Sequence, residues 1–357
     1  MMQEHFDKDR AKAFSQTMMG IMNGGALALM CSLGHRTGLF DTMSTLAPAT
    51  VDGIAEAAAL HPRYVREWLA AMTMGGIVEH DEVADTYYLP REHAGLLTRE
   101  AGPLNLTVYC QYIGLLGQVE DDVLEVFKEG GGVPYDKYPK FTELMAESSG
   151  QRFERALISQ IVPLLGGAAR FEAGLRVADV GCGSGVALNM LAEAYPASRF
   201  TGYDFSDQSV AAARSRAEAL GLENVSFAVR DAAQLGASEQ FDLVTTFDAI
   251  HDQAKPREVL DNIFTALRPG GTYLCVEPKA SSCLHENQGV AMAPFLYTIS
   301  TMHCMTVSMA YGGPGLGTAW GEQMAVEWLG DAGFVDIETT GVPDDRANTY
   351  YLARKPG

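Results

Sequence analysis

The chain has 357 residues, with 26 lysines and arginines against 45 aspartates and glutamates, which give a formal net charge of −19. This length exceeds what one hydrophobic core usually serves, so we expect two domains. The strong negative charge disfavours a polyanionic partner, because nucleic-acid binding depends on lysine and arginine contacts to phosphates. Six cysteines are scattered without a C-x-x-C pair, which favours reduced thiols and a cytoplasmic location.

Residues 17–34 form an uncharged run whose length is close to that of a membrane span. The run contains Asn23 and four glycines, and a charged, helix-like segment precedes it instead of a short basic leader. We therefore expect a helix buried against the rest of the protein or a second subunit, rather than a signal peptide or membrane anchor. Gly20 and Gly24 are small enough to let two helices approach closely, which favours a homodimer.

Residues 26–97 show three short helical patterns followed by two strand patterns. Thr50 is a candidate N-cap for the second helix, and Pro62 opens a third helix that stops at Gly75. Two β-rich runs then flank a polar turn at residues 81–85. This order of elements is the outline of a winged helix, which we assign to residues 1–100.

Residues 101–170 are predicted to be a helical linker, interrupted near Gly130, that contributes to a substrate site. From residue 171 onward, short β-rich runs alternate with helical stretches, which predicts an α/β domain with a Rossmann-like doubly wound sheet. The predicted strands are residues 176–180, 199–203, 226–229, 241–246, 272–276, 335–339 and 349–354.

The motif V-A-D-V-G-C-G-S-G at residues 177–185 joins the first of these strands to a helix. Gly181, Gly183 and Gly185 permit positive φ angles and a close approach between backbone and ligand. Asp204 ends the next strand, 19 residues beyond Gly185, where its carboxylate can accept hydrogen bonds from two ribose hydroxyls. The loop and this acid together predict a nucleotide-like cofactor.

Two further acids follow the same arrangement. Asp179 ends the first strand, and Asp231 ends the third, where its side chain and the backbone N–H of Ala232 can recognise an adenine edge. Ligands of open α/β sheets bind at the carboxyl ends of the strands. The pattern predicts an adenosine cofactor, and the residues alone leave NAD and S-adenosylmethionine as alternatives.

The segments D-V-G-C-G-S-G, T-G-Y-D-F-S, R-D-A, F-D-x-x-H-D and L-R-P-G-G together resemble class I S-adenosylmethionine-dependent methyltransferases over residues 170–357. The glycine spacing differs from the dinucleotide motif G-x-G-x-x-G. The resemblance implies S-adenosylmethionine as the cofactor, with Asp179 at its cationic methionyl end and Phe205 and Phe247 against the adenosine. It also implies an antiparallel hairpin at the end of the sheet, formed by residues 334–355.

The segment that follows the fourth strand, F-D-A-I-H-D-Q-A-K-P, resembles the H-D-W-x-D segment of plant-type small-molecule O-methyltransferases. This resemblance implies that His251 deprotonates the acceptor hydroxyl and that Glu277 orients His251. It also implies that the winged-helix domain serves dimerisation. A second orienting glutamate is expected near residues 316–320, where the chain has no acid, and Glu322 has the wrong spacing to replace it.

Residues 281–318 are predicted to form a substrate cap. Its methionines and aromatic residues either line a pocket for a flat or apolar acceptor or pack the cap against the sheet. They are Met292, Phe295, Tyr297, Met302, His303, Met305, Met309 and Tyr311. The histidines and cysteines in and near the cap match no compact metal-ligand spacing, so we expect no metal.

The leading hypothesis is methyl transfer from S-adenosylmethionine to a hydroxyl of a small molecule. A winged-helix regulator that senses a ligand through the methyltransferase domain is an alternative. Residues 1–100 carry 8 lysines and arginines against 13 aspartates and glutamates, and the candidate recognition helix offers only Arg63 and Arg66, which disfavours DNA binding. Transfer to nitrogen, sulfur or carbon stays open.

Overall fold

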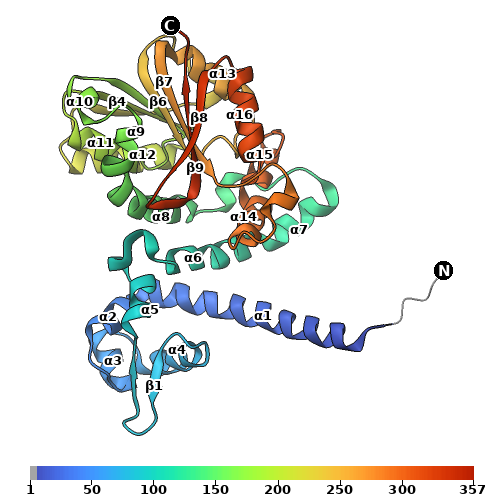
Figure 1. The fold of residues 1–357 in the computed structure, drawn as a ribbon. Helices are drawn as coiled ribbons and strands as arrows, with labels where there is room; N and C mark the ends of the chain where they lie inside the picture. Colours follow the sequence, from blue (N-terminus) through green and yellow to red (C-terminus); the bar gives the residue numbers. More distant parts are fainter. Residues whose placement is uncertain (1–5) are drawn as a thin grey trace. The chain divides into compact units, whose positions relative to one another are not determined.

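The structure is a computed structural model that describes residues 6–357, and it divides the chain into two compact units (Figure 1). The first unit ends at Gly117 and the second begins at Gln118. This boundary falls inside the segment 101–170 that the sequence predicts to be a linker.

The first unit is helical apart from one two-stranded hairpin. Its elements are α1 (Lys8–Thr37), α2 (Leu39–Thr45), α3 (Val51–Ala57), α4 (Pro62–Met74), β1 (Glu79–Asp81), β2 (Thr86–Tyr88), α5 (Arg91–Leu97), the 3-10 helix η1 (Arg99–Leu104) and α6 (Thr107–Leu116). The capping residues act as their sequence context predicts. Thr50 Oγ1 accepts a hydrogen bond from the Gly53 amide at 3.3 Å, and Gly75 ends α4.

The winged-helix core lies between α1, α2, α3 and α4. Phe40, Ile54 and Leu69 are fully buried in it. The indole N–H of Trp68 donates to the Met30 carbonyl at 2.8 Å, so that α4 is tied to α1. Apolar burial and this hydrogen bond together fix the second half of α1 on the domain.

The first part of α1 differs from the sequence expectation. We expected residues 17–34 to be buried, but only the end of the helix, from Cys31 onward, contains buried residues. Phe14, Met18 and Ile21 are exposed, so burial against the rest of the chain is wrong for this part. By length and composition alone, α1 is long and apolar enough to cross a membrane.

The second unit contains a seven-stranded sheet in the order β5-β4-β3-β6-β7-β9-β8. The first five strands in this order are parallel, whereas β9 runs antiparallel to both β7 and β8. The strands are β3 (Arg176–Val180), β4 (Arg199–Asp204), β5 (Val225–Val229), β6 (Phe241–Phe247), β7 (Leu267–Pro278), β8 (Val335–Val342) and β9 (Asp345–Arg354). The predicted Rossmann-like sheet with an antiparallel terminal hairpin is therefore confirmed.

Helices cover both faces of this sheet, and each face has its own apolar core. Helices α8 (Phe141–Ala156), α10 (Ala168–Glu172), α11 (Val186–Ala194) and α12 (Asp207–Ala219) contribute to one core, and α13 (Pro256–Ala266) and α16 (Gly321–Asp331) contribute to the other (Figure 1). Because both faces are covered, most successive residues of β3, β6 and β7 are buried, without the alternation of a strand that has one face in solvent. The loops at the strand ends are left to carry polar side chains.

The remaining elements of the second unit are short. They are η2 (Gly117–Val119), which spans the unit boundary, α7 (Glu120–Glu129), η3 (Tyr135–Lys137), the π-helical turn η4 (Leu157–Ile161), α9 (Val162–Leu164), η5 (Ala232–Gln234), η6 (Leu284–Asn287), α14 (Ala293–Ile299), the π-helical turn η7 (Ser300–Cys304) and α15 (Met305–Ala310). The last four lie within the predicted cap, residues 281–318.

Candidate active site

The glycine loop connects β3 to α11. Gly183 and Gly185 both have positive φ angles, +52° and +68°. A Cβ on Gly185 would lie 2.7 Å from the Phe227 ring and 2.8 Å from the Ala213 side chain, whereas a Cβ on Gly183 would meet no atom within 4 Å. Gly185 is therefore required for close packing, and the backbone at Gly183 is open on the side of the site.

Asp204 holds this loop from the end of β4. Its Oδ2 accepts a hydrogen bond from the Gly183 amide at 2.9 Å, and its Oδ1 accepts one from the Ser206 amide at 2.9 Å. Burial raises the pKa of Asp204, and these backbone donors offset part of that rise. A carboxylate oxygen has more than one acceptor position, so Asp204 can still accept hydrogen bonds from a ligand.

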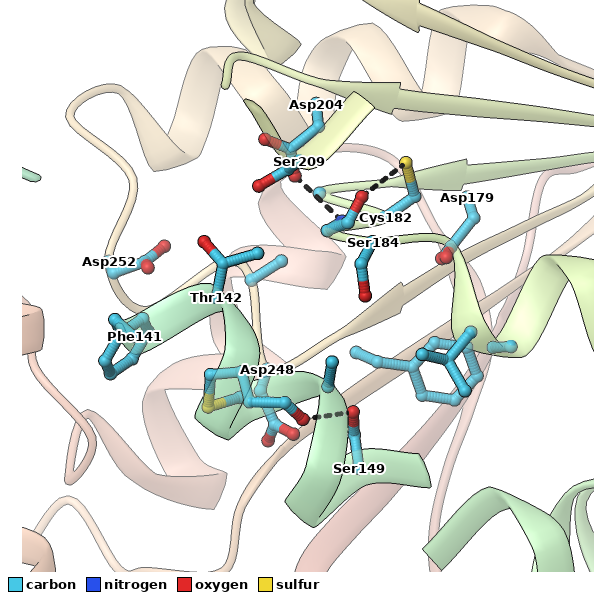
Figure 2. Close-up of a pocket in the computed structure, with 18 of the residues that line it drawn as sticks. Phe141, Thr142, Ser149, Asp179, Cys182, Ser184, Asp204, Ser209, Asp248 and Asp252 are labelled. Carbon is cyan, nitrogen blue, oxygen red and sulfur yellow. Dashed lines mark hydrogen bonds between the residues drawn. The ribbon is translucent and has the colours of Figure 1, made fainter. Parts of the chain in front are cut away.

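A pocket lies at this end of the sheet, and most of the predicted cofactor residues line it. These are Asp179, Gly181, Gly183, Asp204, Phe205 and Phe247. Figure 2 shows the carboxylates of Asp179, Asp204, Asp248 and Asp252 around this pocket. The sequence therefore located the pocket from its acids and glycines.

Three predicted cofactor residues do not line the pocket. Gly185 lies at the start of α11, where it serves packing. Asp231 is exposed, and its side chain caps η5 by accepting a hydrogen bond from the Ala233 amide at 2.9 Å. Ala232, the first residue of η5, is buried.

The sequence singled out no individual lining residue on α8, whereas Asp248 and Asp252 in the loop after β6 belong to the motif F-D-x-x-H-D. Arg152 on α8 forms an ion pair with Asp248 at 3.0 Å and approaches Asp345 at 3.5 Å. Its Nε has no hydrogen-bond partner within the described residues, although it is buried. Asp248 has a positive φ of +54°, a backbone conformation that aspartate tolerates better than most residues. A lone arginine in the predicted linker carried no motif that could have identified it.

Burial raises the pKa of several acids in the pocket. It raises the pKa of Asp179 to about 7, even though the Thr245 hydroxyl donates to the Asp179 carboxylate at 2.7 Å, and nearby Asp204 adds to the rise. Burial also raises the pKa of Asp252 to about 7, against the opposing effect of His251. A bound cation would relieve this destabilisation of the charged carboxylates.

The structure brings His251 and Glu277 together. Their Nδ1 and Oε2 atoms are 2.6 Å apart, and both side chains are buried. The other oxygen of Glu277 accepts a hydrogen bond from the Ile250 amide at 2.8 Å. Burial by itself lowers the pKa of His251, but the charge of Glu277 outweighs burial, so that the pKa is raised well above its usual value.

Trp320 occupies the place where a second glutamate was expected. Its indole N–H donates to Glu277 Oε2 at 3.1 Å, so it contacts the carboxylate rather than the imidazole. Glu322 is exposed on α16, and its backbone amide donates a hydrogen bond to the Ala280 carbonyl. The orienting network therefore contains one acid and one indole.

Neither His251 nor Glu277 lines the pocket, but Asp252, next to His251, does. The Cys304 side chain interacts with His251 and helps to raise the pKa of the histidine. Burial raises the pKa of Cys304, which keeps the thiol protonated. The lining of the pocket therefore includes the neighbour of the histidine but not the histidine itself.

The predicted cap residues lie behind the pocket wall instead of in it. The wall on this side is formed by Tyr135 and Phe141, which contact His303 of the cap. Tyr311 contacts Phe205, which also lines the pocket. The aromatic character of the wall agrees with the sequence prediction, but its residues come from η3 and from the start of α8.

The fold and the pocket define a class of protein, an α/β domain with a pocket lined by a glycine loop and by acids at adjacent strand ends. Residues 171–312 match a family model described as a methyltransferase domain, and residues 25–99 match a model described as an Rv2258c-like winged HTH domain. The chain thus joins a winged helix–turn–helix domain to a methyltransferase domain. The predictions of the fold class and the enzyme class are confirmed.

Curated relatives match the methyltransferase part of the chain. The malonyl-[acyl-carrier protein] O-methyltransferase of Bacillus cereus is 26% identical over 145 residues, which are 41% of this chain and 48% of that protein. The ubiquinone biosynthesis O-methyltransferase of Ruegeria pomeroyi is 34% identical over 110 residues, 30% of this chain and 43% of that protein. The matched region therefore spans less than half the length of these relatives.

Solved structures match over nearly the whole chain. Mitomycin 7-O-methyltransferase has a TM-score of 0.72 at 16% identity and covers 98% of this chain and 100% of its own. Human N-acetylserotonin methyltransferase, solved in complex with S-adenosylmethionine, has a TM-score of 0.66 at 16% identity and covers 100% of both chains. At these identities the likeness establishes the shared fold.

The glycine loop allows a direct test of the packing argument. We predict that Gly185→Ala lowers the free energy of unfolding by about 3 kcal/mol, because the new methyl group overlaps Phe227 and Ala213 and the φ angle stays positive. Gly183→Ala, which shares the positive φ but has open space, should cost about 1 kcal/mol. Urea unfolding measures both variants, and equal losses would contradict the packing role of Gly185.

Proposed function

We propose that this chain transfers a methyl group from S-adenosylmethionine to a hydroxyl of a small-molecule acceptor. The observation that carries the proposal is the glycine loop together with the buried Asp179 and the half-buried Asp204 and Asp252, which line one pocket at the carboxyl ends of the strands. Such a site favours a ligand that brings positive charge, and S-adenosylmethionine carries a sulfonium and an ammonium group. The methyltransferase domain at residues 171–312 supports the same cofactor.

The residues of the pocket suit each part of this cofactor. We assign Asp204 to the ribose hydroxyls, because its carboxylate is fixed beside the open backbone at Gly183. Asp179 is assigned to the ammonium end, and Arg152 to the cofactor carboxylate through its unpartnered Nε. When bound, S-adenosylmethionine supplies the methyl group that the acceptor receives.

The remaining predicted cofactor residues are assigned to the adenosine. Phe205 and Phe247 line the pocket and offer aromatic surface for the nucleoside. Asp231 and the amide of Ala232 are proposed to recognise the adenine edge. Both lie beyond the lining residues, at the end of the neighbouring strand β5, so this assignment requires the adenine to extend past Asp204.

His251 is proposed as the general base. Because Nδ1 donates its proton to Glu277, the second nitrogen, Nε2, carries the basic lone pair. The acceptor hydroxyl gives its proton to Nε2, and the charge of Glu277 stabilises the imidazolium that results. Trp320 and the Ile250 amide hold the Glu277 carboxylate in place during this transfer.

The histidine and glutamate also favour oxygen as the methyl acceptor. A thiol ionises near neutral pH, whereas a phenol or alcohol needs a base to remove its proton. The buried His251–Glu277 pair provides such a base at the carboxyl end of β6, next to the pocket. Transfer to sulfur would leave this pair without a chemical role.

Cofactor binding tests the proposal most simply. We predict that S-adenosylmethionine binds the purified chain and that Asp204→Ala weakens binding at least tenfold, because the variant loses the loop contact and the ribose acceptor. Asp207→Ala is the matched control, since Asp207 is an exposed acid in the first turn of α12. The assignment is contradicted if calorimetry finds no binding of S-adenosylmethionine, or if both variants lose the same affinity.

The pH dependence of turnover tests the role of His251. Activity requires the neutral imidazole, so we predict that kcat rises with pH up to a pKa clearly above the usual histidine value of about 6.5. Glu277→Gln removes the stabilising charge and should move this pKa downward while kcat falls. Glu322→Gln, on an exposed acid, should leave the profile unchanged. If the pH dependence of kcat is the same in Glu277→Gln as in the wild type, His251 is not the base.

We also propose that the protein is a cytoplasmic homodimer in which α1 packs on a second copy. Phe14, Met18, Ile21 and Met22 leave an apolar stripe exposed along α1. A Cβ added at Gly20, Gly24 or Gly25 would meet no atom within 4 Å outside the helix backbone, so another helix could approach this part closely. The scattered, unpaired cysteines agree with a reducing compartment.

The oligomeric state tests this interface. We predict a dimer in light scattering and a monomer for Ile21→Glu, because a charge in the stripe cannot be desolvated. The control is Val83→Glu, which changes an exposed apolar residue in the β1–β2 turn and should leave the dimer intact. A wild-type monomer, or binding of α1 to lipid vesicles in place of dimerisation, contradicts the proposal.

A further inference from the structure

Two cysteines of the first unit lie on helices that pack against each other. Cys31 is in the last two turns of α1, and Cys110 is in the first half of α6. Helix α6 lies along the end of α1, and the two helices are in contact (Figure 1). Both cysteines are free thiols, and both belong to the compact unit that ends at Gly117. The proposed methyl transfer gives this pair no role.

The contacts on either side of the pair define the register of the two helices. His35 Nδ1, near the end of α1, is 3.1 Å from Thr107 Oγ1 at the start of α6. Further along α6, a Cβ added at Gly114 would lie 3.6 Å from the side chain of Leu29 on α1. The helices therefore run antiparallel, and the two cysteines lie at the same level, between these two contacts.

The packing of both side chains agrees with this register. Cys31 is buried in the winged-helix core, and Cys110 is half-buried and packs against the same core. Thr107, Cys110 and Gly114 recur at helical spacing on one face of α6. Because these residues are small, the axes of the two helices can approach closely. A disulfide requires such an approach, since its two Cα atoms lie within about 7 Å of each other.

The two thiols differ in exposure and in acidity. The interaction with Cys31 lowers the pKa of Cys110 below its usual value, against the opposing effect of burial. The same interaction raises the pKa of Cys31, and burial adds to the rise. The Cys110 thiol donates to the Leu106 carbonyl at 3.7 Å, so its sulfur can accept from Cys31. Cys110 is therefore the first of the two to ionise, and the thiolate is the form that reacts with oxidants.

We propose that Cys31 and Cys110 form a redox modification site, which a peroxide converts into a disulfide between α1 and α6. In the first step the Cys110 thiolate attacks one oxygen of hydrogen peroxide and the O–O bond breaks, which gives a sulfenic acid and, after protonation, water. In the second step the Cys31 sulfur attacks the sulfenic sulfur, the S–O bond breaks, and the hydroxide takes the Cys31 proton and leaves as water. The two cysteines lose two electrons, and the peroxide is reduced to two waters.

The disulfide would join parts of the unit that are far apart in sequence. In the cytoplasm that we propose for the chain, the dithiol is the resting state, because disulfides there are mostly transient. Once formed, the bond restricts the unfolded chain and should stabilise the folded unit. The site does not depend on the proposed methyl transfer, so its test needs no cofactor or acceptor.

Hydrogen peroxide is the probe that tests this site. The background is the full chain with Cys283→Ser, which lacks the exposed cysteine and retains five thiols. We predict that peroxide lowers the number of thiols titrated after denaturation from five to three, and that dithiothreitol restores them. Mass spectrometry of the digest should find Cys31 and Cys110 joined within one chain. The melting temperature should rise on oxidation.

Two variants in this background separate the pair from other thiol chemistry. Cys110→Ser should lose no thiol to peroxide, because Cys31 is buried and its pKa is raised. Cys31→Ala should form no disulfide and should stop at a sulfenic acid on Cys110, which dimedone traps.

The peptide map needs no substitution in the pair, so it decides the proposal whether or not the two variants fold. The proposal is overturned if peroxide forms no disulfide, if the disulfide joins other cysteines or two chains, or if a folded Cys110→Ser chain still loses the Cys31 thiol.

Discussion

The burial of carboxylates at the carboxyl ends of neighbouring strands is the constraint on which the site depends. Asp179, one residue before the end of β3, is buried, whereas Asp204 at the end of β4 and Asp252 in the loop after β6 are half-buried. Each has a raised pKa because burial disfavours its charged form. Groups held in this state favour a cationic ligand, and the net charge of −19 adds a general attraction for it.

The rest of the second unit keeps these acids in place. Parallel pairing of β3 with β4 and β6 brings their carboxyl ends to one edge, and two apolar cores hold the sheet between its helices. In the glycine loop, the Gly183 amide donates a hydrogen bond to the Asp204 carboxylate. Gly185 packs closely against Phe227, where a side chain would overlap the ring. The acids are therefore positioned by backbone geometry rather than by flexible side chains.

Local signals in the sequence predicted much of this arrangement. A parallel sheet requires a regular spacing of strands, with the glycine loop and the terminal acids at the strand ends. Asp179, Asp204 and Phe247 could therefore be assigned to one pocket from the sequence. The contact between His251 and Glu277 followed from a family resemblance and is present in the structure. Adjacent strand ends made that contact predictable.

Contacts between distant segments could not be predicted in this way. Trp320 reaches Glu277, Arg152 reaches Asp248, and Phe141 stacks on His303, each across a large separation in sequence and without a spacing rule. The exposure of α1 was also missed, because an apolar helix has the same composition whether its partner is the same chain or another. Tertiary packing decides these features.

The central claim is that the acids around the pocket, whose pKa values are raised by burial, hold a cationic cofactor. Calorimetry of S-adenosylmethionine binding at about pH 6.5, in buffers with different ionisation enthalpies, measures the protons exchanged on binding. The account predicts a net release of protons, since Asp179 and Asp252, with pKa values of about 7, ionise when the positive charge arrives. Binding without proton release, or with proton uptake, would contradict it.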